Sequence, residues 1–178
     1  MKIKELANYR NNGQYDKIVE WADETGNNQI EELDLILFAG EAYKRMGYVQ
    51  KSAQMYWKAL KEYEDENAAD SLLVLYKQMD KADELQQYVD YLEENGLLDD
   101  YLYLARYEIC RIEGGALDEQ IDTLIEYIDE FCNDELYYIL FLELLWEQQK
   151  WELLKRYMNK FHRIFSNSDY EKEYVKPI

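Results

Sequence analysis

The chain has 178 residues, of which 48% are hydrophobic and 15% aromatic, and its formal net charge is −18. This length is enough for one domain with a sizeable core, and the apolar content excludes a disordered chain. The charge disfavours nucleic acids and anionic membranes as direct partners and favours basic or neutral ones.

The scarcity of helix-breaking residues predicts an all-α fold with short turns, since the chain has seven glycines and one proline, Pro177. Cys110 and Cys132 are too few for a disulfide framework, and we interpret both as small buried hydrophobes. The N-terminus lacks the apolar stretch of a signal peptide, and the longest apolar run, 137–146, is too short for a membrane span. We therefore expect a soluble cytoplasmic protein from a bacterium or phage.

The first segment, 1–32, contains a turn at Gly13 and a second turn signal at Gly26-Asn27-Asn28. Between these turns, Ile18 and Ala22 are four residues apart and lie on one face of a predicted helix. We expect this helix to end at about Thr25.

The next segment, 33–66, contains two helical patterns on either side of Gly47. A glycine there lets the first helix end with a positive φ at no steric cost. Gly40 and Ser52 are small residues on the two predicted helices, and we expect the backbones to approach closely where they meet.

The spacing of bulky, small and aromatic residues in 33–66 resembles that of a tetratricopeptide repeat, a pair of antiparallel helices joined by a tight turn. The resemblance implies an all-α, right-handed solenoid of about five such pairs, in which each pair covers apolar surface of the next. The residues that carry the resemblance are Ile36, Ala39, Gly40, Tyr43, Gly47, Ser52, Tyr56 and Ala59.

Counting one repeat length from 33–66 toward each end of the chain gives the other repeats. The third turn, at Met79-Asp80-Lys81, lacks glycine, and Gly114-Gly115 lies about two residues later than the repeat length requires. Because the family's proline at the end of each repeat is missing, a helical-hairpin solenoid of a neighbouring type is an alternative interpretation. The expected organisation is a single domain over 1–165, with repeats at about 1–32, 33–66, 67–99, 100–134 and 135–165, and a polar tail at 166–178.

The sequence contains no phosphate-binding loop, metal-spaced Cys/His set or nucleophile motif, so we expect a protein that is not an enzyme and has no cofactor or metal. In the tetratricopeptide family the inner wall of the solenoid is formed largely by the first helix of each repeat. The resemblance therefore implies a groove that binds a protein or peptide. The residues implied to line it are Arg10, Phe38, Glu41, Lys44, Arg45, Lys77, Tyr103, Tyr107, Arg111 and Trp146.

Basic residues recur near the ends of the predicted first helices, and two interpretations stay open. The helix macrodipole favours a cation at a helix C-terminus by about 0.3–1 kcal/mol, and this effect alone accounts for the positions. Alternatively, the cations form a basic strip that holds a peptide with acidic and aromatic or aliphatic anchors. The cations concerned are Arg10, Lys44 with Arg45, Lys77 and Arg111, whereas the fifth repeat has Trp146.

Two other functions are compatible with this sequence. Some small acidic tetratricopeptide proteins are secretion-type chaperones for one client, and a strongly acidic protein can act as an inhibitor that mimics nucleic acid. A clamp for chaperone C-termini is not expected, because Leu37 and Glu41 stand where the family has Lys and Asn. The fifth repeat is rich in aromatic and aliphatic residues, and a homo-oligomer through this repeat is a further hypothesis.

Overall fold

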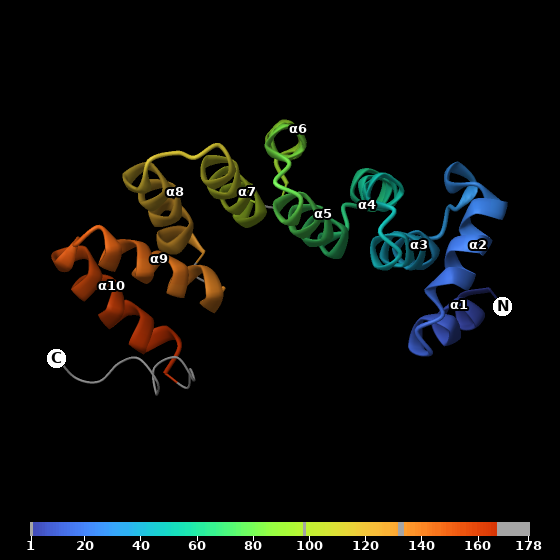
Figure 1. The fold of residues 1–178 in the computed structure, drawn as a ribbon, viewed down its shortest axis with the longest axis horizontal. Coiled ribbons are helices and arrows are strands. Elements are labelled where there is room, and N and C mark those ends of the chain that lie inside the picture. Colours follow the sequence, from blue (N-terminus) through green and yellow to red (C-terminus); the bar gives the residue numbers. More distant parts are fainter. Residues whose placement is uncertain (1, 98, 132–133, 167–178) are drawn as a thin grey trace. The chain divides into compact units, whose positions relative to one another are not determined.

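The computed structural model describes residues 2–97, 99–131 and 134–166. Within these ranges the chain forms ten α-helices and one short 3-10 helix, η1 (Asn27–Gln29) (Figure 1). The α-helices are α1 (Lys2–Asn11), α2 (Tyr15–Thr25), α3 (Leu33–Arg45), α4 (Val49–Tyr63), α5 (Glu66–Gln78), α6 (Ala82–Asn95), α7 (Asp99–Ile112), α8 (Leu117–Glu130), α9 (Glu135–Glu147) and α10 (Trp151–Ile164).

The ten helices form five consecutive helix-turn-helix pairs, from α1 with α2 to α9 with α10. The predicted all-α fold of about five such pairs is confirmed. Apart from Ser166, the predicted tail at 166–178 lies outside the described residues, as does Cys132. Cys110 is half-buried rather than fully buried, and burial raises the pKa of its thiol.

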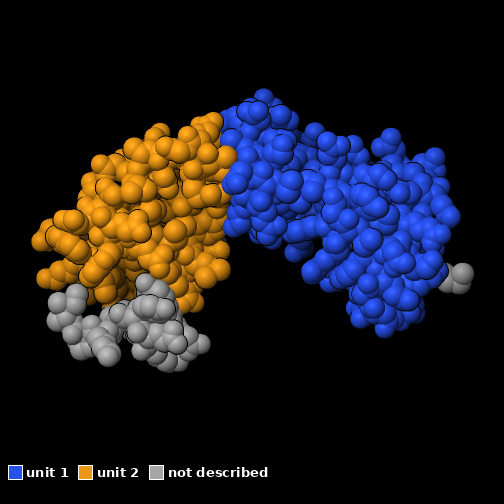
Figure 2. All heavy atoms as spheres, viewed as in Figure 1, with its two compact units in different colours: residues 1–101 blue, residues 102–178 orange. Residues whose placement is uncertain are grey.

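Contacts divide the chain into two compact units, residues 1–101 and residues 102–178 (Figure 2). In unit 1, α4 packs against both α3 and α5, α1 and α2 both contact α3, and α6 contacts α5. In unit 2, α9 packs against α8 and α10. The boundary falls within α7, and the single domain over 1–165 stays a prediction.

The same turn joins the two helices in all five pairs of the described chain. The residue with positive φ donates its N–H to the carbonyl three residues earlier, and the next N–H donates to the carbonyl five residues before it. In the second pair, the N–H of Gly47 donates to Lys44 O (3.1 Å) and that of Tyr48 to Tyr43 O (2.8 Å). The residues with positive φ are Gly13, Gly47, Asp80, Gly114 and Gln149.

Two of these turns are made without glycine, at Asp80 (φ 50°) and Gln149 (φ 54°). A residue with a Cβ is strained in this conformation by about 1–2 kcal/mol, so the packing of the flanking helices must impose it. Asp80 and Gly114 are as far apart in sequence as Gly13 and Gly47 are. The fourth turn therefore lies where the repeat length places it. The expected delay of about two residues was wrong.

We expect Gln149→Gly to stabilise the protein by about 0.5–1 kcal/mol, because relief of the positive-φ strain outweighs the entropy that glycine loses on folding. The matched control is Gly47→Gln, which puts the same residue type into the same turn of another pair. A Cβ at Gly47 would meet no atom within 4 Å, so this change tests the backbone effect alone. Urea unfolding should show shifts of opposite sign, and shifts of the same sign would contradict the explanation.

The close approach expected within 33–66 is present between α3 and α4. Ser52 Oγ donates a hydrogen bond to the carbonyl of Gly40 (2.9 Å). A Cβ added to Gly40 would lie 2.8 Å from Cε1 of Tyr56. Tyr43 and Tyr56 are both buried beside this contact. The small residues that carry the resemblance thus have the predicted packing role.

Polar contacts of buried tyrosines connect successive pairs inside unit 1. The hydroxyl of Tyr43 donates to Oδ1 of Asp23 (2.6 Å), so it links α3 to the end of α2. Lys51 Nζ lies 2.6 Å from the same oxygen. The hydrogen bonds from Lys51 and Tyr43 lower the pKa of Asp23, while burial and the carboxylate raise that of Tyr43. Substitution of Asp23 is therefore expected to weaken the packing of α2 against α3.

Candidate partner-binding surfaces

A basic side chain occupies the same position of the repeated turn in four of the five pairs. It lies three residues before the residue with positive φ, and its own carbonyl accepts the N–H of that residue. This position is in the last turn of the first helix, where the helix dipole favours positive charge. The four residues are Arg10, Lys44, Lys77 and Arg111, and α9 has Trp146 instead.

Three of the predicted groove residues contact one another between α1 and α3. Arg10 Nε lies 2.9 Å from Glu41 Oε2, and the Arg10 guanidinium lies 5.7 Å from the centre of the Phe38 ring. About half of the Arg10 side chain is exposed. The ion pair therefore neutralises part of the positive charge and fixes the guanidinium at the surface, but it leaves Arg10 accessible to a partner.

The other predicted residues of unit 1 also lie at the ends of first helices. The guanidinium of Arg45, at the end of α3, is exposed and lies 5.8 Å from the ring centre of Tyr15. Lys44 and Lys77 are half-buried at the ends of α3 and α5. Lys44 and Lys77 occupy equivalent positions in successive turns.

Exposed apolar side chains follow these cations in the same turns, and the sequence analysis did not single them out. Met46, Tyr48 and Met79 are 45%, 49% and 46% exposed. Met46 and Met79 each directly precede the residue with positive φ. A bulky apolar residue within a turn is the sequence feature that indicates such an exposed side chain. We call the following set the basic turn surface: Arg10, Lys44, Arg45, Lys77, Met46, Tyr48 and Met79.

Tyr107 was expected on the inner wall, but the structure buries it in unit 2. Its side chain is 1% exposed, and its ring lies 6.0 Å from that of Tyr137 in an edge-to-face contact. Burial raises the pKa of Tyr107 to about 12. The reason is helical spacing, because Tyr107 lies three residues after Leu104 on the stripe of α7 that faces the core. Tyr107 is a core residue and not a surface contact.

Arg111 and Tyr103 are engaged with neighbours inside unit 2. Arg111 Nε lies 2.7 Å from Oε2 of Glu108, a buried carboxylate that also accepts a hydrogen bond from the hydroxyl of Tyr137 (2.9 Å). The ring of Tyr103 is half-buried, 5.6 Å from that of Phe131. Arg111 thus compensates a buried charge, which the sequence pattern did not show.

Trp146, at the end of α9, is 57% exposed and is therefore accessible to a partner. The sequence analysis missed its neighbour Trp151, which begins α10 and is 51% exposed. The two ring centres are 5.2 Å apart and the planes are nearly perpendicular, at 87°. The turn between α9 and α10 therefore presents two adjacent indole rings to solvent.

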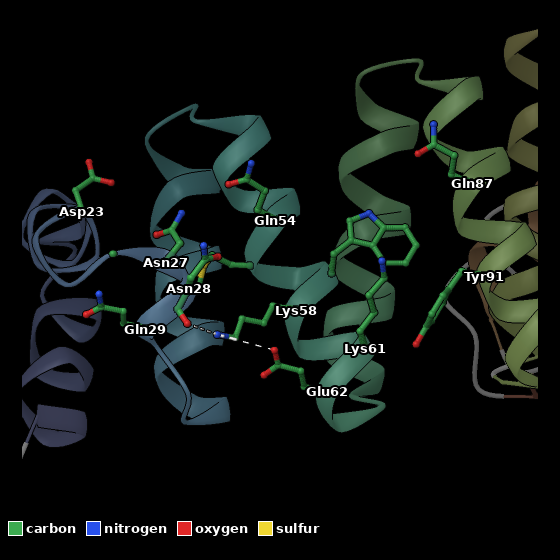
Figure 3. A pocket seen from close by; sticks show the side chains of 13 residues that line it. Asp23, Asn27, Asn28, Gln29, Gln54, Lys58, Lys61, Glu62, Gln87 and Tyr91 are labelled. Carbon is green, nitrogen blue, oxygen red and sulfur yellow. Dashed lines mark hydrogen bonds and ion pairs between the residues drawn. The ribbon is translucent and has the colours of Figure 1, made fainter.

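A groove of about 1150 Å³ lies on the second helices of unit 1, where no site was predicted (Figure 3). The end of α2, the 3-10 helix η1, the exposed side of α4 and part of α6 form its walls. The lining residues are Asp23, Gly26, Asn27, Asn28, Gln29, Gln54, Met55, Trp57, Lys58, Lys61, Glu62, Gln87 and Tyr91.

Both lysines of this groove are held by neighbours. Lys58 Nζ donates to the carbonyl of Asn28 (3.1 Å) and lies 3.9 Å from Glu62 Oε1, as drawn in Figure 3. Lys61 Nζ lies 4.9 Å from the Trp57 ring centre and 5.6 Å from that of Tyr91. Because Lys61 covers the indole, the amide side chains are the main groups left to bind a ligand. Each amide offers a donor and an acceptor, which suits the peptide backbone.

In the described part of the chain, no group of three or more His, Cys, Asp or Glu side chains could hold a metal ion. None of the described helices combines the length and apolar character needed to cross a bilayer.

Comparisons with known proteins identify the fold. No protein-family model and no curated protein matches the sequence. A tetratricopeptide repeat protein from Parabacteroides merdae ATCC 43184 superposes with a TM-score of 0.61 at 18% identity, over 94% of this chain and 64% of that one. A structure of MamA (AMB-1) superposes with a TM-score of 0.55 at 17% identity, over 98% of this chain and 95% of that one. This likeness establishes a tetratricopeptide-like helical repeat fold.

Proposed function

We propose that this chain is a non-enzymatic adaptor that binds a protein or peptide partner through the basic turn surface of unit 1. The fold is typically a protein-binding scaffold, and the partner suited to this surface is an acidic segment with aliphatic or aromatic anchors. We place the adaptor in the reducing cytoplasm, with which the unpaired thiol of Cys110 is compatible.

The observation that carries the proposal is the recurrence of a cation at one position of the same turn. Arg10, Lys44 and Lys77 occupy this position in the three successive pairs of unit 1, although the chain has 38 acidic and only 20 basic residues. The helix dipole explains a cation there but does not explain the exposed methionines beside it. Met46 and Met79 are adaptable apolar contacts of the kind found at binding surfaces.

The free energy of binding expected for such a complex requires both ion pairs and apolar contacts. An exposed ion pair contributes about 0.2–1 kcal/mol, so three or four pairs supply only a few kcal/mol. A micromolar complex needs about 8 kcal/mol. Burial of apolar surface on Met46, Tyr48 and Met79, at about 25 cal/mol per Å², must contribute the larger share. Binding should weaken as salt is added but should not vanish.

We expect Lys44→Glu with Arg45→Glu to weaken binding to acidic peptides by about tenfold or more, because two attractive contacts become repulsive. The measurement is an array of random twelve-residue peptides probed with the labelled protein, followed by titration of the selected peptides. Wild-type protein should select peptides rich in Asp and Glu that also contain Leu, Ile or aromatic residues.

The matched control is Lys155→Glu with Arg163→Glu, since both side chains are exposed on α10 and the net charge changes equally. This variant should bind the selected peptides nearly as well as the wild type. Circular dichroism checks that both variants stay folded. The basic turn surface is excluded as the site if the selected peptides are not acidic, or if the two variants lose equal affinity.

The groove on the second helices is the other surface of unit 1 that suits a peptide. Its five amide side chains favour backbone recognition of an extended segment, whatever the charge of that segment. Selection of neutral peptides whose binding depends on Gln54 and Gln87 would move the site to this groove. Self-association through the fifth pair also stays a hypothesis, and light scattering that shows a monomer at high concentration would argue against it.

A further inference from the structure

The helix α9 departs from the pattern of the other first helices. Its last turn contains no basic residue, whereas α1, α3, α5 and α7 all have one. At the position of the recurring cation α9 has Trp146, and Glu143 and Glu147 lie three residues before and one after it. Both carboxylates are exposed, and neither forms an ion pair within the described part of the chain.

This arrangement is electrostatically unfavourable in the isolated chain. The C-terminal end of a helix carries partial negative charge, so acidic side chains there are disfavoured. Two acidic residues four positions apart on one helix also repel each other. A positive charge brought to the end of α9 would relieve both effects. The chain places its own cation there in its other pairs but not in this one.

The indole pair supplies a second, independent attraction for a cation. Tryptophan is the side chain whose ring face attracts cations most strongly. The chain's two other tryptophans already have one, since Lys2 lies 5.7 Å from the Trp21 ring centre and Lys61 lies 4.9 Å from that of Trp57. Within the described residues no cation lies over Trp146 or Trp151.

The neighbouring lysine does not fill this position. Lys150 lies in the turn between the two tryptophans, but its Nζ is 2.9 Å from Oδ1 of Asp118 on α8. The exposed indoles and the two carboxylates therefore face solvent together. Charge complementarity with a cationic group is what this turn offers.

We propose that the turn between α9 and α10 is a second binding site, which takes an arginine or lysine side chain of a cationic peptide segment. The cation stacks on the indole of Trp146 or Trp151, and Glu143 and Glu147 pair with its charge. The site lies in unit 2, does not use the basic turn surface, and does not rest on the function proposed for that surface.

The probe is a glycine-serine peptide with three arginines, compared with the same peptide carrying citrulline, which keeps the shape and removes the charge. Binding is followed by tryptophan fluorescence and by calorimetry. We expect the arginine peptide to bind saturably and the citrulline peptide to bind about tenfold or more weakly. Trp146→Ala with Trp151→Ala should abolish the binding measured by calorimetry. Both residues are more than half exposed, so this variant should fold.

A charge-matched pair of variants separates the site from general attraction to an acidic protein. Glu143→Gln with Glu147→Gln should weaken binding by about fivefold or more. Asp122→Gln with Glu126→Gln removes the same charge from exposed positions of the same spacing on α8 and should change binding by less than about twofold. Equal losses in these two variants, or full binding by the tryptophan variant, would overturn the proposal.

A second copy of the chain could instead cover the two indoles. In that case the wild type sediments as a dimer, the tryptophan variant sediments as a monomer, and neither binds the arginine peptide. This result also overturns the proposal. A monomeric wild type that binds the arginine peptide through Trp146 and Trp151 supports it.

Discussion

Replacing Tyr138 by alanine is expected to destabilise the protein by about 3–5 kcal/mol, the usual effect of deleting a large buried aromatic side chain. Tyr138 is fully buried on α9. Its ring centre lies 5.3 Å from that of Phe161 and 5.9 Å from that of Phe165, so it joins α9 to α10 and to the residue that follows. The change opens a cavity between the helices, which the remaining rings can fill only in part.

The matched control for this prediction is Tyr138→Phe, which keeps the ring and removes the hydroxyl. That hydroxyl donates to the carbonyl of Tyr157 (3.0 Å), so we expect a loss of about 0.5–1.5 kcal/mol. Urea unfolding followed by circular dichroism measures both variants. If the phenylalanine variant loses as much stability as the alanine variant, the hydrogen bond rather than ring packing holds α9 against α10.

The second large effect is expected from Gly40→Val, which should destabilise the protein by about 2–3 kcal/mol. The first side-chain carbon would lie 2.8 Å from Tyr56 Cε1 and 3.1 Å from its Cδ1. Tyr56 is buried, so its ring cannot swing out of the way. α3 and α4 must separate, which weakens the hydrogen bond from Ser52 to the Gly40 carbonyl. Relief of glycine's entropy cost offsets only about 0.5–1 kcal/mol of this.

A double-mutant cycle with Tyr56→Leu tests this mechanism, because leucine removes the ring atoms that the new side chain would meet. We expect the two changes together to cost less than the sum of the single changes, by about 1 kcal/mol. Strict additivity in urea unfolding would show that Gly40 is required for a reason other than its contact with Tyr56.

The sequence predicted the fold well because the packing of 33–66 depends on local spacing. Gly40, Ser52 and Tyr56 have to be small, small and large where two helices cross, and these residue types are visible without a structure. The turns at Asp80 and Gln149 were harder to place, since a residue other than glycine adopts positive φ there only under the constraint of the flanking helices.

The candidate surfaces were harder to predict than the fold. Tyr107 has the residue type of a surface contact, and only the rotation of α7 decides that it faces the core. The sequence analysis did not single out Trp151, because its exposure depends on how α10 packs against α9. The groove with Lys61 is formed by residues of three helices and η1 that are far apart in sequence, so no local pattern indicates it.

Amide chemical-shift mapping during titration with an acidic peptide selected from the array tests most directly whether the ends of the first helices bind a partner. Binding at the basic turn surface predicts the largest shifts at the turn amides of Gly13, Gly47 and Asp80, whose N–H groups contact the carbonyls of the three cationic residues. Shifts confined to Asn28, Gln54 and the rest of the second-helix groove, with the three turns unchanged, would contradict the proposal.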